Sequence, residues 1–222
     1  MSEKETTVAA ESPNRWALAQ YDVVLHVPER LVGGIPKNPE LIKSWLAGRG
    51  VTLGVEAVVE AEKEKLDGQL IQEGAWKGFY SDSTGLFIEE RNPRGLLKDS
   101  AKANPNCGTK TVKAALKKLT VNLRIDPVRI YPTNAEGKPF TEPTGSEERA
   151  VHVMTPQGPR TALKKSDYVR DARLSFRLTA SHPDLSETFL RDLLDYGQWF
   201  LGIGSDVSQG EGKYIVEKFE KV

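Results

Sequence analysis

The stretch DARLSFRLTA, residues 171–180, decides the fold of this chain. Its apolar residues fall at every second position from Ala172 to Leu178, and the positions between them are polar: Arg173, Ser175, Arg177 and Thr179. A two-residue period predicts a β-strand that buries one face and exposes the other. The exposed face of this strand would carry two arginines.

A helix and a last strand are predicted after this stretch. In residues 184–201, DLSETFLRDLLDYGQWFL, the leucines and Phe189 form one stripe at helical spacing. Asp184 and Glu187 have the spacing of a capping box, so the helix is expected to begin there. Residues 213–220, KYIVEKFE, alternate again and predict a strand.

The segments before this stretch predict more strands and helices. The strands are expected at 21–28 (YDVVLHVP), 83–90 (STGLFIEE), 119–125 (LTVNLRI), 128–132 (VRIYP) and 149–156 (RAVHVMTP), and the helices at 40–50, 52–73, 91–103 and 111–118. This order favours an α+β, ferredoxin-like (RRM-like) antiparallel sheet with helices on one face. The alternating strands would leave the second face of the sheet polar and open.

The same patterns divide the chain into an arm and one domain. Residues 1–16 are polar and aperiodic, which is typical of a flexible N-terminal arm. Residues 17–222 would form the domain, with an insertion at about 36–80 that holds the inserted helix. The segment 133–148, TNAEGKPFTEPTGSEE, has no periodicity and predicts a long exposed loop.

The composition indicates the cellular compartment in which the protein is expected. The chain of 222 residues has a single cysteine, Cys107, so an intrachain disulfide and a cysteine-ligated zinc site are excluded. There is no run of about 18 apolar residues, and the first residues lack the apolar region of a signal peptide. We therefore expect a cytoplasmic protein without membrane contact.

The charges balance in total, with 31 basic and 31 acidic residues, but they are separated along the chain. Residues 91–130 contain ten basic and two acidic residues, and 149–177 contain seven basic and two acidic ones, whereas 51–90 are acidic. A basic surface binds nucleic acid by releasing counterions from the phosphates. The alternative is that the acidic segment pairs with the basic ones. Arg124, Arg173 and Arg177 favour the first interpretation, because all three fall on polar strand faces.

A glycine-rich segment joins the last predicted helix to the last strand. It reads GIGSDVSQGEGKY and contains Gly202, Gly204, Gly210 and Gly212. It matches neither a Walker loop nor the dinucleotide-binding fingerprint. Paired glycines allow positive φ and leave amide groups open to phosphate oxygens. The alternative is a tight crossover from helix to strand.

With the strand at 171–180 and the leucine-rich helix before it, this segment resembles the C-terminal end of the RAMP superfamily, the ferredoxin-like RNA-binding proteins of CRISPR systems. Those proteins place Gly-x-Gly, about five residues, then Gly-x-Gly between their last helix and strand. A weaker likeness is PRGLLKDSAKA at 93–103, similar to the family segment in which Lys and Gly open the first helix near the RNA. The resemblance covers roughly the last fifty residues and also admits a relative of phage origin.

The resemblance implies RNA held across the glycine-rich segment and the open sheet face. Many members are non-catalytic subunits that bind guide RNA beside other subunits, including copies of themselves, and others are endoribonucleases that use a histidine general base. The resemblance supplies the glycines of the expected RNA-binding set, and our assignment of strand and helix faces supplies the basic residues. The full set is Arg91, Arg94, Lys98, Arg124, Arg160, Lys164, Lys165, Arg173, Arg177, Gly202, Gly204, Gly210, Gly212 and Lys213.

Of the three histidines, His26 is the candidate general base, because it falls on the polar face of the first strand. A hydrogen-bonded histidine without catalytic function is the alternative. Asp82 is a weaker candidate as a loop acid for metal-dependent cleavage. No motif for a metal or a cofactor is present in the sequence, and we expect none.

The aromatic residues Trp76, Phe79 and Tyr80 surround Lys77 in the segment AWKGFY. Exposed rings beside a cation stack on the bases of single strands, and buried rings form part of a core. The sequence favours a core position for these rings.

The function predicted from sequence is a non-catalytic single-stranded RNA-binding subunit, with a histidine endoribonuclease or a single-stranded DNA-binding or protein-interaction module as alternatives.

Overall fold

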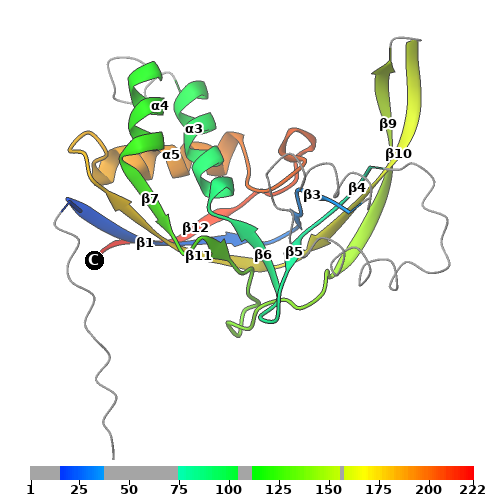
Figure 1. Cartoon of the computed structure of the whole chain (residues 1–222), viewed down its shortest axis with the longest axis horizontal. Coiled ribbons are helices and arrows are strands. Elements are labelled where there is room, and N and C mark those ends of the chain that lie inside the picture. Colours follow the sequence, from blue (N-terminus) through cyan, green and yellow to red (C-terminus); the bar gives the residue numbers. More distant parts are fainter. Residues whose placement is uncertain (1–15, 38–74, 105–111, 156–157) are drawn as a thin grey trace, which may run out of the picture.

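A computed structural model describes residues 16–37, 75–104, 112–155 and 158–222 of the chain (Figure 1). The expected arm at 1–16, apart from Trp16, and the expected helices at 40–50 and 52–73 lie outside the described residues. The helices are α3 (Arg91–Ala103), α4 (Val112–Val121) and α5 (Glu187–Phe200). The strands are β1 (Ala19–Val27), β2 (Leu31–Val32), β3 (Ile35–Pro36), β4 (Ala75–Gly78), β5 (Tyr80–Ser81), β6 (Leu86–Glu89), β7 (Leu123–Asp126), β8 (Arg129–Ile130), β9 (Gly145–Thr155), β10 (Gly158–Val169), β11 (Ala172–Ala180) and β12 (Ile215–Lys221).

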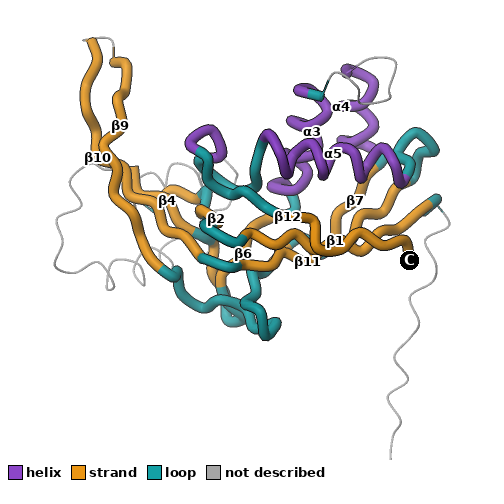
Figure 2. Tube along the Cα trace, turned by 180° about the vertical axis from the view of Figure 1, so that it is seen from behind, coloured by secondary structure: helices purple, strands orange, loops and turns teal. Residues whose placement is uncertain are grey.

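The main sheet has four strands in the order β12-β1-β11-β7, and every neighbouring pair is antiparallel. Counting only these strands, the order is fourth, first, third, second along the chain, which is the ferredoxin-like arrangement. In both views, α3, α4 and α5 lie on the same side of this sheet (Figures 1 and 2). The predicted α+β, ferredoxin-like fold with helices on one face is confirmed.

The alternating residues of the central strands explain why this fold forms. The apolar residues of β11, from Ala172 to Leu178, are all buried, and so are Val23 and Leu25 of the paired β1. They pack with the apolar side chains of the three helices into one core. A leucine-to-alanine change at such a position costs about 2–5 kcal/mol of stability. The helix-covered face therefore fixes the register of the sheet.

A second sheet leads away from the first. Its strand order is β2-β10-β4-β3, and β9 pairs with β10 along a long antiparallel hairpin. After β10 the chain turns at Arg170 and Asp171 and continues as β11, so one stretch of chain links the two sheets. The hairpin projects beyond the body of the molecule in both views (Figures 1 and 2). A third, smaller sheet contains β5, β6 and β8.

Three element boundaries differ from the prediction. The strand expected at 119–125 begins only at Leu123, because α4 continues through Val121, whose side chain is exposed. Leu119 is buried all the same, since it lies on the inner face of the helix. The exposed loop expected at 133–148 gives way to β9 at Gly145.

The third difference is at the start of α5. Ser186, not Asp184, is the N-cap, and its side chain accepts a hydrogen bond from the amide of Phe189. Asp184 instead pairs with Lys118.

Among the helices of the described residues, none has the length and apolar content needed to cross a bilayer.

Candidate nucleic-acid interface

The glycine-rich segment is a loop whose two ends meet. The amide of Ile203 donates to the carbonyl of Gly212 at 2.8 Å. Gly212 has a φ of 69°, and a Cβ atom at this position would lie 1.9 Å from the carbonyl oxygen of Ile203. Only glycine allows the two backbone segments to approach so closely. We call residues 203–212 the glycine loop.

The glycine loop also packs against the segment that follows β1. The amide of Ser205 donates to the carbonyl of Val32 at 3.1 Å, and that of Gly212 donates to the carbonyl of Arg30 at 2.9 Å. A Cβ on Gly204, whose φ is 96°, would lie 2.9 Å from the Val32 carbonyl oxygen. The positive φ values of Gly204 and Gly212 thus serve contacts of the chain with itself, as a tight crossover requires. Gly210, by contrast, lies at the exposed tip with open space around it.

Two adjoining clefts lie between the glycine loop and the start of α3. They have volumes of about 290 and about 180 Å³ and share Arg91, Asn92 and Gly204 in their walls. The larger cleft extends to Tyr80 and Phe87, and the smaller one to Gly95, Asp99 and Leu201. We call the two clefts together the groove. The structure thus brings Arg91 next to Gly202 and Gly204, which are two other members of the expected RNA-binding set.

The floor of the groove is open at Gly95, which has no side chain. No atom lies within 4 Å of the position that a Cβ atom of Gly95 would occupy. Gly95 therefore leaves room that a long side chain such as glutamine would fill. Arg91 borders this space and donates to Tyr80 Oη at 3.1 Å, while its Nε lies 2.6 Å from Glu89.

A row of cations continues from the groove along α3. Arg91, Gly95, Lys98 and Lys102 are separated by four, three and four residues, so they lie on one face of the helix. The buried residues of α3, such as Leu97 and Ser100, lie on the opposite face. Lys102 pairs with Asp99 at 2.8 Å. We call Arg91, Lys98 and Lys102 the α3 row.

Arg94 does not belong to this row. Its guanidinium pairs with Glu90 at 2.8 Å and donates to the carbonyls of Leu119 and Leu123 at 3.0 and 2.7 Å. It therefore connects α3 to the end of α4 and the start of β7. The structure gives this predicted RNA-binding residue a role in the fold.

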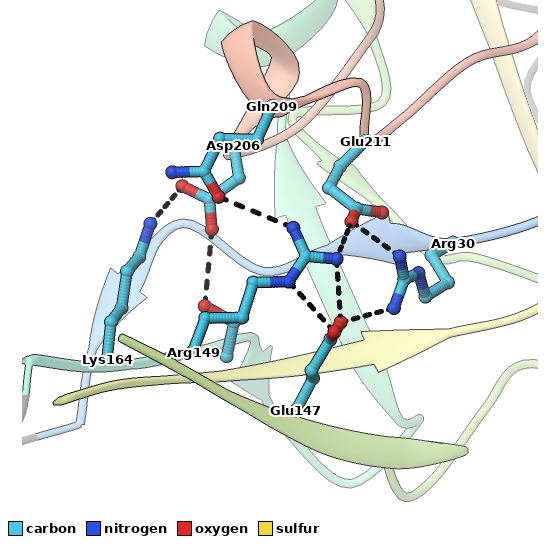
Figure 3. A network of polar contacts seen from close by, with 8 residues as sticks. Arg30, Glu147, Arg149, Lys164, Asp206, Gln209 and Glu211 are labelled. Carbon is cyan, nitrogen blue, oxygen red and sulfur yellow. Dashed lines mark hydrogen bonds and ion pairs between the residues drawn. The ribbon is translucent and has the colours of Figure 1, made fainter. Parts of the chain in front are cut away.

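On its other side, the glycine loop is held to the base of the β9–β10 hairpin by ion pairs (Figure 3). Arg149 of β9 contacts Glu147 at 2.8 Å and Glu211 at 2.7 Å. Arg30 contacts the same two carboxylates. Glu211 is only 7% exposed, so its charge depends on these two guanidinium groups. Hydrogen bonds from Arg149 lower the pKa of Glu147.

Asp206 forms the second half of this contact. Its backbone is left-handed, with a φ of 59°, and its carboxylate accepts from Lys164 of β10, from Lys77 of β4 at 3.4 Å and from Ser166 at 3.2 Å. Burial raises the pKa of Asp206, but the hydrogen bonds and the two lysine charges outweigh it and lower the pKa overall. Lys164, a predicted RNA-binding residue, is therefore paired within the protein.

The open face of the main sheet carries charges of both signs. Arg173 lies 2.9 Å from Glu217, Arg177 lies 2.7 Å from Asp22, and Arg124 lies 2.8 Å from Asp126. The face was expected to be basic, and these neighbouring carboxylates make it mixed instead. RNA binding by these three arginines stays a prediction.

His26 lies on the same face, between two carboxylates. Its Nε2 is 2.5 Å from Asp171 and its Nδ1 is 3.3 Å from Glu217. In this arrangement neither ring nitrogen is turned toward open solvent as a free base. The geometry favours the interpretation of His26 as a hydrogen-bonded residue.

Asp82 is likewise engaged by its surroundings. Its carboxylate accepts from Tyr131 and Arg129, both at 2.8 Å, and from the amide of Thr84 at 2.9 Å. These contacts, with Tyr131 first, lower its pKa. Asp82 closes the turn between β5 and β6. No group of three His, Cys, Asp or Glu side chains that could hold a metal ion occurs in the described ranges.

The aromatic cluster divides between core and surface. Phe79 is buried, whereas Trp76 is half-buried and donates to Asp167 at 2.9 Å. The ammonium groups of Lys37 and Lys165 lie over the ring of Trp76, at 5.3 and 4.7 Å from its centre. Tyr80 stacks on Phe87 at the larger cleft. The prediction of a core position is confirmed for Phe79 only.

Two predicted residues remain. Lys213 donates to the carbonyl of Leu201 at 2.7 Å and so closes the end of α5. Arg160 lies in β10, opposite Val153, but its side chain lies outside the described part. Sequence reasoning missed Arg30, Glu147 and Arg149 as members of one network, because Arg30 is 117 residues from Glu147 and both arginines also pair with Glu211 on the glycine loop. It also missed Asn92, which no motif identifies.

No protein-family model matches the sequence, and no curated protein matches it. Among solved structures, the chain is similar to a chain of the type III-B Cmr-β bound to cognate target RNA, with 13% sequence identity and a TM-score of 0.50 over 92% of this chain and 60% of that chain. It is also similar to a CRISPR protein from Archaeoglobus fulgidus, with 12% identity and a TM-score of 0.38 over 92% and 64% of the two chains. The first likeness shows a shared fold, and this chain spans about 60% of the length of that protein.

Proposed function

We propose that this chain binds single-stranded RNA, such as a guide RNA, in the groove between α3 and the glycine loop, as a non-catalytic subunit of a CRISPR-type ribonucleoprotein complex. One observation carries this proposal: the open position at Gly95 lies in the same groove as the glycine loop, and the α3 row continues from it. The fold is also that of a chain from an RNA-bound Cmr-β, which agrees with the proposal.

The groove suits a nucleic-acid backbone for steric reasons. Gly95 keeps a side chain out of the space, so a sugar-phosphate strand can lie close to the main chain of α3 at this point. Arg91 at the entrance has the planar, multiply donating group that binds phosphates best. The α3 row extends over about 16 Å along the helix, enough to contact more than one phosphate.

The surroundings of His26 and Asp82 support a role without catalysis. The ring nitrogens of His26 face carboxylates, and Asp82 is held by Tyr131 and Arg129. A general base must reach the 2′-hydroxyl of its substrate with a free nitrogen. Neither of these candidates is arranged for such a step.

A series of substitutions at Gly95 tests the site. Gly95→Ala adds one methyl group and replaces a helical glycine by the best helix former, so it should leave RNA binding nearly unchanged and stabilise α3 by up to about 1 kcal/mol. Gly95→Gln should weaken binding by filling the groove, and Gly95→Glu, of nearly the same size, should weaken it further by charge repulsion. Fluorescence anisotropy with a labelled single-stranded RNA measures all three.

The thermal stability of each variant is the control, because Gly95 has no neighbour that a side chain would strike. Equal RNA affinity for the wild type, the Gln variant and the Glu variant would reject the groove as the binding site. Cleavage of the RNA by the wild-type protein, lost in His26→Ala, would establish the endoribonuclease in place of the proposed subunit. Tighter binding of single-stranded DNA of the same sequence would reject RNA as the ligand.

A further inference from the structure

The larger cleft of the groove has walls that suit a flat, uncharged group. The rings of Tyr80 and Phe87 are stacked, with their centres 5.2 Å apart, and both residues line the cleft. The charged residues of its lining are Glu89 and Arg91, and the Nε of Arg91 lies 2.6 Å from the Glu89 carboxylate, so the two charges balance. A nucleobase has the matching form, because its apolar faces stack on aromatic rings and its polar edge forms hydrogen bonds.

This cleft adjoins the place where the RNA backbone is proposed to lie. The two clefts share Arg91, Asn92 and Gly204, and the smaller one contains the open position at Gly95. A strand that passes Gly95 can therefore turn one base into the larger cleft. The volume of about 290 Å³ is close to the lower end of the range for small-ligand sites, about 300–1,000 Å³, as a single base requires.

Asn92 brings a side-chain amide to the junction of the two clefts. It shares a face of α3 with Gly95 and Asp99, three and seven residues further along, and this face lines the smaller cleft. Side chains on a helix lean toward its N-terminus, which is the end of α3 at the larger cleft. The Asn92 amide is half-buried and has no hydrogen-bond partner among the residues that the structure describes. It is therefore able to bond a ligand as donor or acceptor.

Glu89 limits which base edge the larger cleft can accept. An ionised carboxylate only accepts hydrogen bonds, and its two oxygens have lone pairs beyond those that face Arg91. Cytosine, adenine and guanine carry an exocyclic amine that can donate to it. Uracil instead carries a carbonyl oxygen on each side of its one ring N–H, and these oxygens would be repelled by the carboxylate. Glu89 thus favours a base with an exocyclic amine.

We propose that the larger cleft holds one base of the bound RNA and selects a base with an exocyclic amine over uracil. Glu89 accepts a hydrogen bond from the amine, Asn92 bonds the ring nitrogen beside it, and the base lies against the wall formed by Tyr80 and Phe87. This selection rests on the proposed function, because the base belongs to the strand that lies in the groove. It adds a preference for sequence to a strand that is otherwise held by its backbone.

The experiment compares two RNAs that differ in this amine. Cytosine and uracil have nearly the same size, so labelled oligocytidylate and oligouridylate of about 8 nucleotides, within the range of single-strand site sizes, form a matched pair. Fluorescence anisotropy at neutral pH measures both affinities. The wild-type protein should bind oligocytidylate about 5-fold or more tightly than oligouridylate, which is the lower end of the discrimination by one paired base contact.

Three variants assign the preference to the cleft. Glu89→Gln should remove most of it, because an amide can donate to a carbonyl oxygen as well as accept from an amine. Asn92→Ala should weaken the binding of oligocytidylate more than that of oligouridylate. Glu90→Gln is the matched control, since it removes the same charge from the next residue, whose carboxylate pairs with Arg94 and does not line the groove. This variant should retain the preference.

The failure of the base selection differs from the failure of the proposed function. Equal wild-type affinities, or tighter binding of oligouridylate, would overturn the selection while the binding itself still reports the groove. A preference that survives in Glu89→Gln, or that Glu90→Gln lowers equally, would overturn it as well, and equal losses of both RNAs in Asn92→Ala would remove Asn92 from the contact. Absence of binding of both RNAs to the wild type would instead reject the proposed function.

Discussion

Gly95, Gly210 and Gly212 are the same residue type in three different situations. Gly95 has an ordinary helical backbone and open space, Gly210 has a φ of 89° and open space, and Gly212 has a φ of 69° and a carbonyl oxygen in the way. Only the last combines backbone strain with a steric clash. The pattern Gly-x-Gly therefore predicts the position of the glycine loop but not the reason for each glycine.

This difference predicts unequal losses of stability. Gly210→Ala should cost about 1–2 kcal/mol, the cost of placing a side chain in the left-handed region. Gly212→Ala should cost clearly more, because its Cβ would displace the Ile203 carbonyl and break the hydrogen bond between the loop ends. Urea unfolding of the two variants provides the measurement. Equal midpoints for the two variants would contradict the described closure of the loop.

At the scale of elements, the structure distinguishes between two candidate N-cap residues at the start of α5. Asp184 and Ser186 both precede the helix, and the spacing of Asp184 and Glu187 favoured the first. The structure selects Ser186, whose extended backbone lets its oxygen reach the amide of Phe189. A cap depends on backbone geometry at one residue, and sequence spacing alone does not supply that.

Alanine variants at the two positions measure this choice. Ser186→Ala should lower the free energy of unfolding by about 1 kcal/mol, the usual loss of an N-cap. Asp184→Ala removes an exposed ion pair with Lys118 and should cost less, since such pairs contribute about 0–1 kcal/mol. Chemical denaturation at neutral pH compares them. A larger loss for Asp184→Ala would return the cap to that residue.

Other elements show where the sequence was sufficient. β1 and β11 were predicted correctly because one face of each strand is apolar and buried and the other is largely polar, and β12 was located although its pairing with β1 contains a register shift. The strand β10 was not predicted, because Lys164, Lys165, Ser166 and Asp167 interrupt any apolar period. Its polar residues are accommodated by neighbours distant in sequence, among them Asp206 and Trp76. Pairing between remote segments has no local signal.

At the scale of the whole molecule, many of the 31 basic and 31 acidic residues meet in ion pairs between elements. Arg30 and Arg149 meet Glu211 of the glycine loop, Lys77 and Lys164 meet Asp206, and the arginines of the sheet face have carboxylates beside them. The sequence indicated separate acidic and basic segments, and it named the glycines and Arg91 among the expected RNA-binding residues. It could not show which cations are neutralised by the fold, because most of these pairs join segments that are distant in the sequence.

The salt dependence of RNA binding distinguishes the two predicted surfaces. The double variant Lys98→Ala, Lys102→Ala should lower the slope of log affinity against log salt by about 0.7 for each phosphate that the protein no longer neutralises. Arg124→Ala with Arg177→Ala should leave the slope nearly unchanged, because both arginines lie on the open face of the main sheet, away from the groove, beside Asp126 and Asp22. Anisotropy titrations at several salt concentrations test both pairs. A slope reduced only by the second pair would return the binding site to the open sheet face.

The closed neck of the glycine loop has a practical consequence. Ile203 and Gly212 are joined by a hydrogen bond, and the tip from Val207 to Gly210 is exposed. The tip can therefore be lengthened without disturbing the fold that supports it. A short peptide tag or a fluorophore attachment site inserted after Ser208 would extend outward from a fixed base. Such a probe would sit beside the groove and report its occupancy in real time.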